Sequence, residues 1–171
     1  MTNPLTVHVI GTPVQQGSKV ANRFGGGVRD SNAAKLRPWR AEVAGSVAAV
    51  MQHTGWATLD GPIDVTLAFF HQRPSSHYGT GRNAGVLKAS APRLEGHGAR
   101  HRQSLTRAIL DALTDSRAIR DDARVARLTV EDRWADAATG VRITVAPLTD
   151  TPAPPAPSPA DAASSPEGAL F

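Results

Sequence analysis

The sequence predicts an α+β domain in which two helices pack on a small mixed β-sheet, in the order β-α-β-loop-α-β-β. Two observations carry this prediction: short segments in which apolar and polar residues alternate, and two longer segments in which apolar residues recur at helical spacing. The chain has 171 residues, of which 40% are hydrophobic. This length suits one domain with a core and is too short for two ordinary domains.

The first half of the chain is expected to form a strand, a loop, a helix and a second strand. Apolar and polar residues alternate over 5–10, as in a strand with one buried face. Residues 14–36 are polar and rich in glycine, so a flexible loop is expected there. Pro38 suits the first turn of a helix over about 38–53, because its missing N–H would be unpaired there anyway. The apolar run IDVTLAFF predicts a strand over 63–70.

The second half is expected to begin with a long loop. Residues 71–100 hold glycine, serine, histidine and basic residues without an apolar period, and a loop of this length is usually functional or disordered. Apolar residues then recur at offsets of three and four from Leu105 to Leu113, which predicts a second helix with one apolar face. Two further strands are expected at about 124–133 and 140–147.

The composition limits the class of protein. We expect a domain over 1–148 and a disordered tail over 149–171, because this Pro/Ala/Ser-rich segment buries too little apolar surface to offset the entropy of ordering it. The chain has no cysteine, which excludes disulfides, thiolate metal sites and a cysteine nucleophile. No signal peptide is recognisable, and no apolar run approaches the roughly 20 residues of a membrane span. A soluble, cytoplasmic protein without a membrane partner is expected.

The charge is unevenly distributed. The formal net charge is +4, with a pI near 10.3, which favours a polyanionic partner such as a nucleic acid. Between His71 and Arg107 there is one acid, Glu95, against seven basic residues: Arg73, Arg82, Lys88, Arg93, Arg100, Arg102 and Arg107. Lys19, in the glycine-containing run QQGSK, is a further candidate for a phosphate contact. The alternative is a solvated basic surface without a partner.

Two adjacent aspartates, Asp121 and Asp122, directly precede the third predicted strand. This position is expected to let a carboxylate converge with groups at the start of the second helix. Carboxylates gathered in this way hold Mg²⁺, and metal-assisted cleavage of a phosphodiester needs such a cluster. The alternative is a solvated acidic turn, because paired aspartates are common in turns.

Longer motifs resemble the RusA family of Holliday-junction resolvases, in particular its phage-type members. They are L-x-R-A-I-L-D-A-L-T-D followed by R-D-D-A-R-V at 105–125, and VQQGSK followed by DSNAAKLRPWR at 30–40. The resemblance covers about residues 5–147. It implies a RusA-like fold and a homodimeric, Mg²⁺-dependent endonuclease of DNA recombination and repair, in a bacterial or phage-infected cell. Such an enzyme recognises four-way DNA junctions and nicks two opposed strands.

By position, the resemblance assigns the family's catalytic metal ligand to Asp122, with Asp121 beside it. The family's helix lysine falls on Arg107, which keeps the charge but changes its geometry. The two aspartates of the family's D-x-D motif fall on His101 and Gln103, so at least two anionic ligands are missing.

Because Mg²⁺ prefers carboxylate oxygens, we expect weak metal binding or none, and impaired cleavage. A histidine suits Mn²⁺ or another transition metal better. Glu95 is the alternative source of a replacement ligand.

Three functions therefore stay open: a junction-resolving endonuclease that uses Asp121, Asp122 and a replacement ligand; an inactive or regulatory protein that binds branched DNA; and a protein-interaction module. The DNA contacts are assigned to basic residues of the loop, the second helix and the first loop: Lys19, Arg73, Arg82, Lys88, Arg93, Arg100 and Arg102. The terminal EGALF loosely resembles peptides that bind bacterial sliding clamps, the alternative being an unconstrained terminus.

Overall fold

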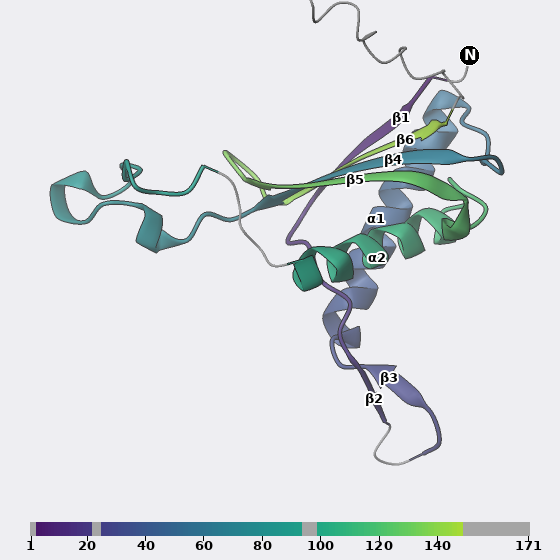
Figure 1. Cartoon of the computed structure of the whole chain (residues 1–171), viewed down its shortest axis with the longest axis horizontal. Helices are drawn as coiled ribbons and strands as arrows, with labels where there is room; N and C mark the ends of the chain where they lie inside the picture. The colour runs from purple at the N-terminus through teal and green to yellow at the C-terminus, as the bar shows by residue number, and fades with distance from the viewer. Residues whose placement is uncertain (1–2, 22–24, 94–98, 149–171) are drawn as a thin grey trace, which may run out of the picture.

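The computed structural model describes residues 3–21, 25–93 and 99–148. It confirms the α+β architecture, with two helices on one face of a small four-stranded mixed sheet (Figure 1). The glutamate at position 95 and the tail from 149, including EGALF, lie outside the described residues.

The sheet has the strand order β1-β6-β4-β5. β1 (Leu5–Ile10) and β4 (Ile63–His71) each pair with β6 (Gly140–Pro147) in the antiparallel sense. β5 (Val125–Trp134) pairs with β4 in parallel and forms one edge of the sheet. Helix α2 (Ala99–Asp115) makes the crossover between these two parallel strands.

The core lies between the sheet and the helices. Alternate residues of β4 (Ile63, Val65, Leu67 and Phe69) are completely buried on the helix-facing side. They belong to one cluster with the helix residues Trp39, Val43, Val47, Leu105, Ile109 and Leu113. The apolar residues that recur at a period of two in the strands and of 3.6 in the helices therefore pack against each other in one interface.

Helix α1 (Ala33–Thr54) begins earlier than predicted. The carbonyl of Asn32 accepts the N–H groups of Lys35 and Leu36, so Pro38 lies in the second turn rather than the first. Pro38 has no N–H to donate to the carbonyl of Ala34, so the helix lacks one of its hydrogen bonds there. The helix ends at Gly55, whose left-handed φ of 68° lets its N–H return to the carbonyl of Met51.

A short hairpin stands where the sequence predicted a loop. β2 (Lys19–Ala21) pairs with β3 (Val28–Asp30), and the hairpin projects away from the body (Figure 1). At its base, Asp30 Oδ1 accepts the N–H groups of Gly17 at 3.0 Å and Asn32 at 2.7 Å. Strands of three residues are too short to show an alternating pattern, which is why the sequence did not predict them.

Residues 72–93, called the arm below, form a second projection (Figure 1). The arm contains two single-turn 3₁₀ helices, η1 (Ser75–His77) and η2 (Gly81–Asn83). The indole N–H of Trp134 donates to the carbonyl of Pro92 at 3.0 Å, and Arg73 donates to the same carbonyl at 2.8 Å. The Trp134 bond attaches the base of the arm to the end of β5, and the Arg73 bond joins the two ends of the arm to each other. Neither described helix is long and apolar enough to cross a membrane.

Candidate functional site

The amino-terminal end of α2 lies between the two projections, the β2–β3 hairpin and the arm (Figure 1). The N–H of Gln16 donates to the carbonyl of Ser104 at 3.2 Å and ties the chain that leads into the hairpin to this end of the helix. His101 and Gln103, which the resemblance placed at the family's D-x-D motif, both belong to this region.

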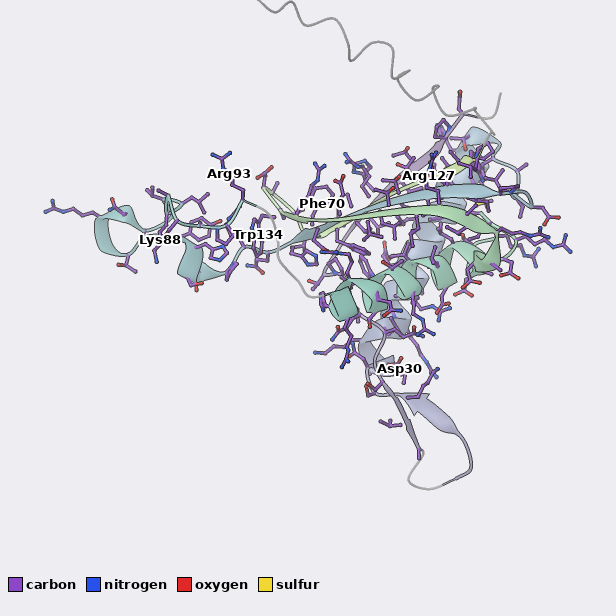
Figure 2. All side chains as sticks on the ribbon, in the orientation of Figure 1. Asp30, Phe70, Lys88, Arg93, Arg127 and Trp134 are labelled. Carbon is purple, nitrogen blue, oxygen red and sulfur yellow. The ribbon has the colours of Figure 1, made fainter. Side chains whose placement is uncertain are left out.

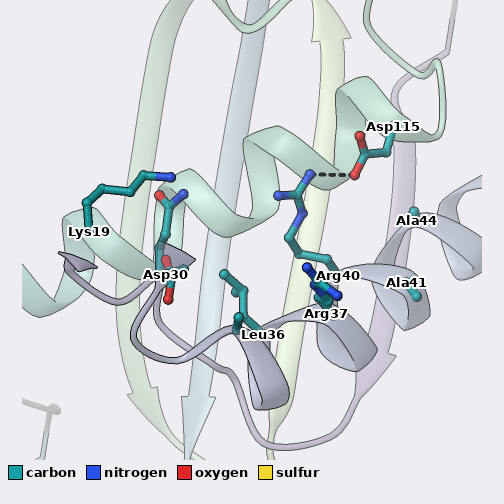
Figure 3. A pocket seen from close by; sticks show the side chains of 10 residues that line it. Lys19, Asp30, Leu36, Arg37, Arg40, Ala41, Ala44 and Asp115 are labelled. Carbon is teal, nitrogen blue, oxygen red and sulfur yellow. Dashed lines mark hydrogen bonds and ion pairs between the residues drawn. The ribbon is translucent and has the colours of Figure 1, made fainter. Parts of the chain in front are cut away.

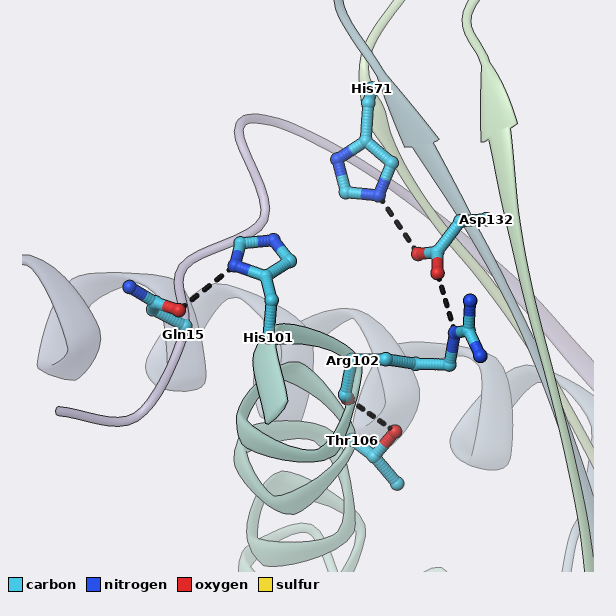
Figure 4. Close-up of polar contacts among 6 residues, drawn as sticks. All are labelled: Gln15, His71, His101, Arg102, Thr106 and Asp132. Carbon is cyan, nitrogen blue, oxygen red and sulfur yellow. Dashed lines mark hydrogen bonds and ion pairs between the residues drawn. The ribbon is translucent and has the colours of Figure 1, made fainter. Parts of the chain in front are cut away.

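A buried carboxylate organises this end of the helix (Figure 4). The side chain of Asp132, on β5, is 1% exposed. One oxygen lies 3.0 Å from Nε2 of His71, and the other accepts from Nε of Arg102 at 2.7 Å. Burial raises the pKa of Asp132, but the hydrogen bonds and positive charge of Arg102 and His71 outweigh it and hold that pKa below its usual value. Asp132 is therefore ionised at neutral pH.

His101 is part of the same polar network. Its Nδ1 lies 2.9 Å from Oε1 of Gln15, and its ring centroid lies 6.1 Å from that of His71. The hydroxyl of Thr106 donates to the carbonyl of Arg102 at 2.9 Å. The network joins α2 to the ends of β4 and β5 and to the segment before the hairpin, so this end of α2 has a defined polar structure.

The acidic pair lies at the other end of α2. Asp121 precedes η3 (Asp122–Arg124), and its carboxylate accepts the N–H of Ala123 at 2.9 Å. That bond, the neighbouring Asp122 side chain and the positive Arg124 and Arg120 lower the pKa of Asp121. Both aspartates are exposed. Asp121 is therefore ionised at neutral pH, and both side chains are accessible.

The expected convergence of the pair with the start of α2 does not occur within one chain. His101 is in the first turn of α2 and Asp115 is its last residue, a rise of about 20 Å at roughly 1.5 Å per residue. In a β-α-β crossover the helix runs antiparallel to both strands. The start of the following strand, and with it Asp122, therefore lies at the carboxyl end of the helix.

Several of the predicted DNA-binding residues gather at the base of the arm. Arg73, Arg93 and Arg102 line a hollow of about 640 Å³ beside the end of β5, together with Arg133. The guanidinium of Arg73 lies over the Trp134 ring, 5.0 Å from its centroid. Arg82 and Lys88 lie farther out along the arm, whereas Arg127 lies toward the other end of the sheet (Figure 2). Arg100 is exposed on the first turn of α2.

Lys19 is not part of this group. It lines a second hollow, of about 630 Å³, between the hairpin, α1 and α2 (Figure 3). There Arg40 bridges the helices through ion pairs with Asp111 at 3.1 Å and Asp115 at 2.6 Å. Arg107 is exposed on α2, one turn after the exposed Gln103.

A comparison with family models identifies the chain. Residues 11–146 match the family described as endodeoxyribonuclease RusA, and this range contains both helices and most of the sheet. The chain belongs to the RusA endodeoxyribonuclease family. No curated protein matches it. Membership confirms the resemblance, and it associates the chain with Holliday-junction resolution and with nucleases that generally depend on divalent metal ions.

The described residues do not fit the metal site that the RusA family implies. Among them, no three His, Cys, Asp or Glu side chains are placed to hold an ion together. Asp132, which contacts Arg102 near the start of α2, already binds Arg102 and His71 through its two oxygens. At the other end of the helix, Asp121 has two arginines as neighbours, Arg120 and Arg124, and both of them also pair with Asp60.

Sequence reasoning missed Asp132 and His71 in this RusA domain. The signal for Asp132 was present, because it occupies a position of β5 that faces the helices along with Leu128 and Val130, where the alternation calls for an apolar residue. An acid on the buried face of a strand needs a partner in the fold. His71, which pairs beside it at the end of β4, carries no comparable signal.

Proposed function

We propose that this protein is a homodimer that binds branched DNA, in particular four-way junctions, and that its cleavage activity is impaired. The observation that carries the proposal is the start of α2, where His101 and Gln103 occupy the acidic positions of the family and a buried ion pair between Arg102 and Asp132 lies beside them. Membership of the RusA family supplies the DNA substrate class.

The distribution of charge supports DNA binding. Four arginines line the hollow at the base of the arm against three acids, Glu131, Asp132 and Asp136, and the exposed Arg82, Lys88 and Arg100 add positive charge without an acid. Arg102 contributes less than the others, because Asp132 already offsets its charge. Two acids fewer at the start of α2 also means less repulsion of phosphate groups.

The chemistry of the donors supports impaired cleavage. Mg²⁺ requires hard oxygen ligands, and an imidazole and an amide replace two carboxylates here. The nearby guanidinium of Arg102 repels a cation as well. His101 is a better ligand for Mn²⁺ than for Mg²⁺, so any residual activity is expected to favour Mn²⁺.

The geometry of one chain supports the homodimer. A metal ion binds ligands at distances of about 2 Å, whereas Asp122 and His101 lie at opposite ends of α2. A site that combines the pair with the start of the helix therefore has to take one of them from a second chain. The exposed carboxyl groups of Asp121 and Asp122 favour the active endonuclease as the second candidate, with a replacement ligand such as Glu95.

Retardation of a labelled four-way junction in a native gel tests the proposal, with a linear duplex of the same arm sequences as the control. We expect the junction to bind more tightly than the duplex. If about six phosphates are contacted, affinity should fall roughly a thousandfold between 50 and 200 mM salt. Equal retardation of both substrates, or none at low salt, would contradict the proposal.

The arm should supply part of this salt dependence. We expect Arg82→Ala combined with Arg93→Ala to lower the slope of log affinity against log salt by about 2, since each change removes about one phosphate contact. Neither arginine is ion-paired among the residues that the structure describes. Arg117→Ala, at the far end of α2, is the matched control and should leave the slope unchanged. The measurement is a salt titration of junction binding.

A further inference from the structure

β5 leaves one edge of the sheet open. It is the outer strand in the order β1-β6-β4-β5, and no other described strand pairs with its free edge. The N–H of Ala135 donates to the carbonyl of His71 on β4, and main-chain groups alternate in direction along a strand. Leu128, Val130 and Asp132 therefore direct their N–H and C=O groups outward. Leu128, 42% exposed, is one of the few large apolar side chains on the surface.

The middle of this strand is complementary to itself. Residues 127–131 read Arg-Leu-Thr-Val-Glu. When two copies of this segment run antiparallel about a two-fold axis at Thr129, each Arg127 faces a Glu131, and each Leu128 faces a Val130. Within one chain Arg127 pairs with Asp64 and Glu131 pairs with Arg133, so the contact across the axis would extend these ion pairs. Opposite charges and apolar pairs facing each other across strands stabilise a sheet.

We propose that a second copy of the chain pairs with the first along β5, antiparallel and with the two-fold axis at Thr129, so that one sheet continues through both chains. The proposal rests on the homodimer of the proposed function and specifies its interface.

The direction of the main-chain N–H and C=O groups along the free edge of β5 agrees with this register. Leu128 and Val130 both direct their main-chain groups outward, so they can form a hydrogen-bonded pair across the interface. Thr129 directs its own groups toward β4, as a residue of a non-hydrogen-bonded pair does. An axis at Val130 instead would place Arg127 opposite Arg133, and like charges facing each other are destabilising.

The two ends of β5 are complementary as well. The acidic Asp121 and Asp122 precede the strand, and the hollow beside its last residues is lined by four arginines against three acids, Glu131, Asp132 and Asp136. Antiparallel pairing brings the start of each strand alongside the end of the other. Each acidic pair then lies near the arginine-lined hollow, and the start of α2, of the other copy.

Single cysteines test the register, because the chain has none of its own. Two Thr129→Cys residues would face each other with Cα atoms about 4.5 Å apart, within the range that a disulfide accepts. We expect rapid oxidation of this variant to a covalent dimer. Arg133→Cys and Arg127→Cys, on the same exposed face, should not cross-link, since the symmetry separates each from its own copy by at least about 13 Å. Thr6→Cys, on the opposite edge of the sheet, controls for random collision.

Equal cross-linking at Thr6 and Thr129, or a maximum at another position of β5, would overturn the proposed pairing. Sedimentation of the unmodified protein at micromolar concentration should give a dimer, and a monomer would overturn it also.

A change of charge tests the Arg127–Glu131 contact. Glu131→Lys should raise the dimer dissociation constant about tenfold, because symmetry places two like-charge pairs in the interface. Glu42→Lys makes the same change on the exposed surface of α1 and should have no effect. Adding Arg127→Glu to Glu131→Lys should recover dimerisation. Failure to recover it in a protein that is still folded would count against the register.

These measurements are made without DNA, so they can be separated from the proposed function. Cross-linking of the Thr129→Cys variant without binding to a junction would support the proposed interface and contradict the proposed function. Junction binding by a protein that does not cross-link at Thr129 would retain the function and remove this interface.

Discussion

Replacing Asp132 with alanine is expected to lower the free energy of unfolding by about 3 kcal/mol, the usual cost of removing one partner of a buried ion pair. His71 would lose the acceptor of its Nε2, at a side chain that is only 11% exposed, while Arg102 at 39% can turn toward water. For a domain of this size the melting temperature should fall by roughly 6 to 12 °C. Urea denaturation measures the change.

Asp136→Ala is the matched control for this experiment. Asp136 is exposed two residues after the end of β5, and its loss should change the stability by less than about 0.5 kcal/mol. A loss of stability at Asp132 no larger than at Asp136 would mean that the ion pairs with Arg102 and His71 contribute nothing to the fold.

The contribution of Asp132 should also depend on pH. Its pKa is lowered by folding, so the stabilisation is complete above the pKa of the unfolded chain, about 3.9, and is lost as the pH falls through the lower folded value. The stability difference between the unmodified protein and Asp132→Asn should therefore be at its full value at about pH 5 and should shrink as the pH falls further. Urea denaturation at several pH values tests this, and a difference that grows below about pH 4 would contradict it.

The combined change His101→Asp and Gln103→Asp is expected to produce junction cleavage in Mg²⁺ at least about a hundredfold faster than that of the unmodified protein. Restoring both carboxylates supplies the anionic oxygen ligands that the ion requires, and metal assistance is worth several kcal/mol in a phosphodiester transition state. Release of labelled products from a four-way junction measures the rate. His101→Asn with Gln103→Asn is the neutral control and should stay inactive.

The proposed interface along β5 adds a requirement to the predicted cleavage by the His101→Asp, Gln103→Asp variant. Because Asp122 and the start of α2 are at opposite ends of one chain, the restored carboxylates can act with Asp122 only across a dimer. Adding either Asp122→Asn or Glu131→Lys should therefore abolish or weaken the restored cleavage. Cleavage by the unmodified protein that Asp122→Asn removes would show instead that another ligand already replaces the lost acids.

The main helices and strands could be predicted from local sequence patterns, because the spacing of the apolar residues shows which face of each element is buried. The alternation over 5–10 gave the bounds of β1, and the stripe from Leu105 to Leu113 lies within α2. The β2–β3 hairpin was missed because its strands are too short to alternate, and β2 has no buried residue.

The candidate site could be predicted less well, because it depends on how the elements are arranged. The resemblance to the family showed that positions 101 and 103 correspond to its metal ligands. It did not show how far these positions lie from Asp122. That distance follows from the parallel pairing of β4 with β5, a contact between segments about 60 residues apart. Asp132 needed the same information, since only the fold shows that Arg102 and His71 lie close enough to neutralise it.

The bond between Trp134 and Pro92 fixes the base of the arm to the last residue of β5. In a dimer that pairs along this strand, the two arms are related by the same two-fold axis and leave the shared sheet at opposite ends. A four-way junction has a matching symmetry, because its opposed strands are equivalent under a half-turn. Protein and DNA could then share one axis, with each arm holding an equivalent pair of DNA arms.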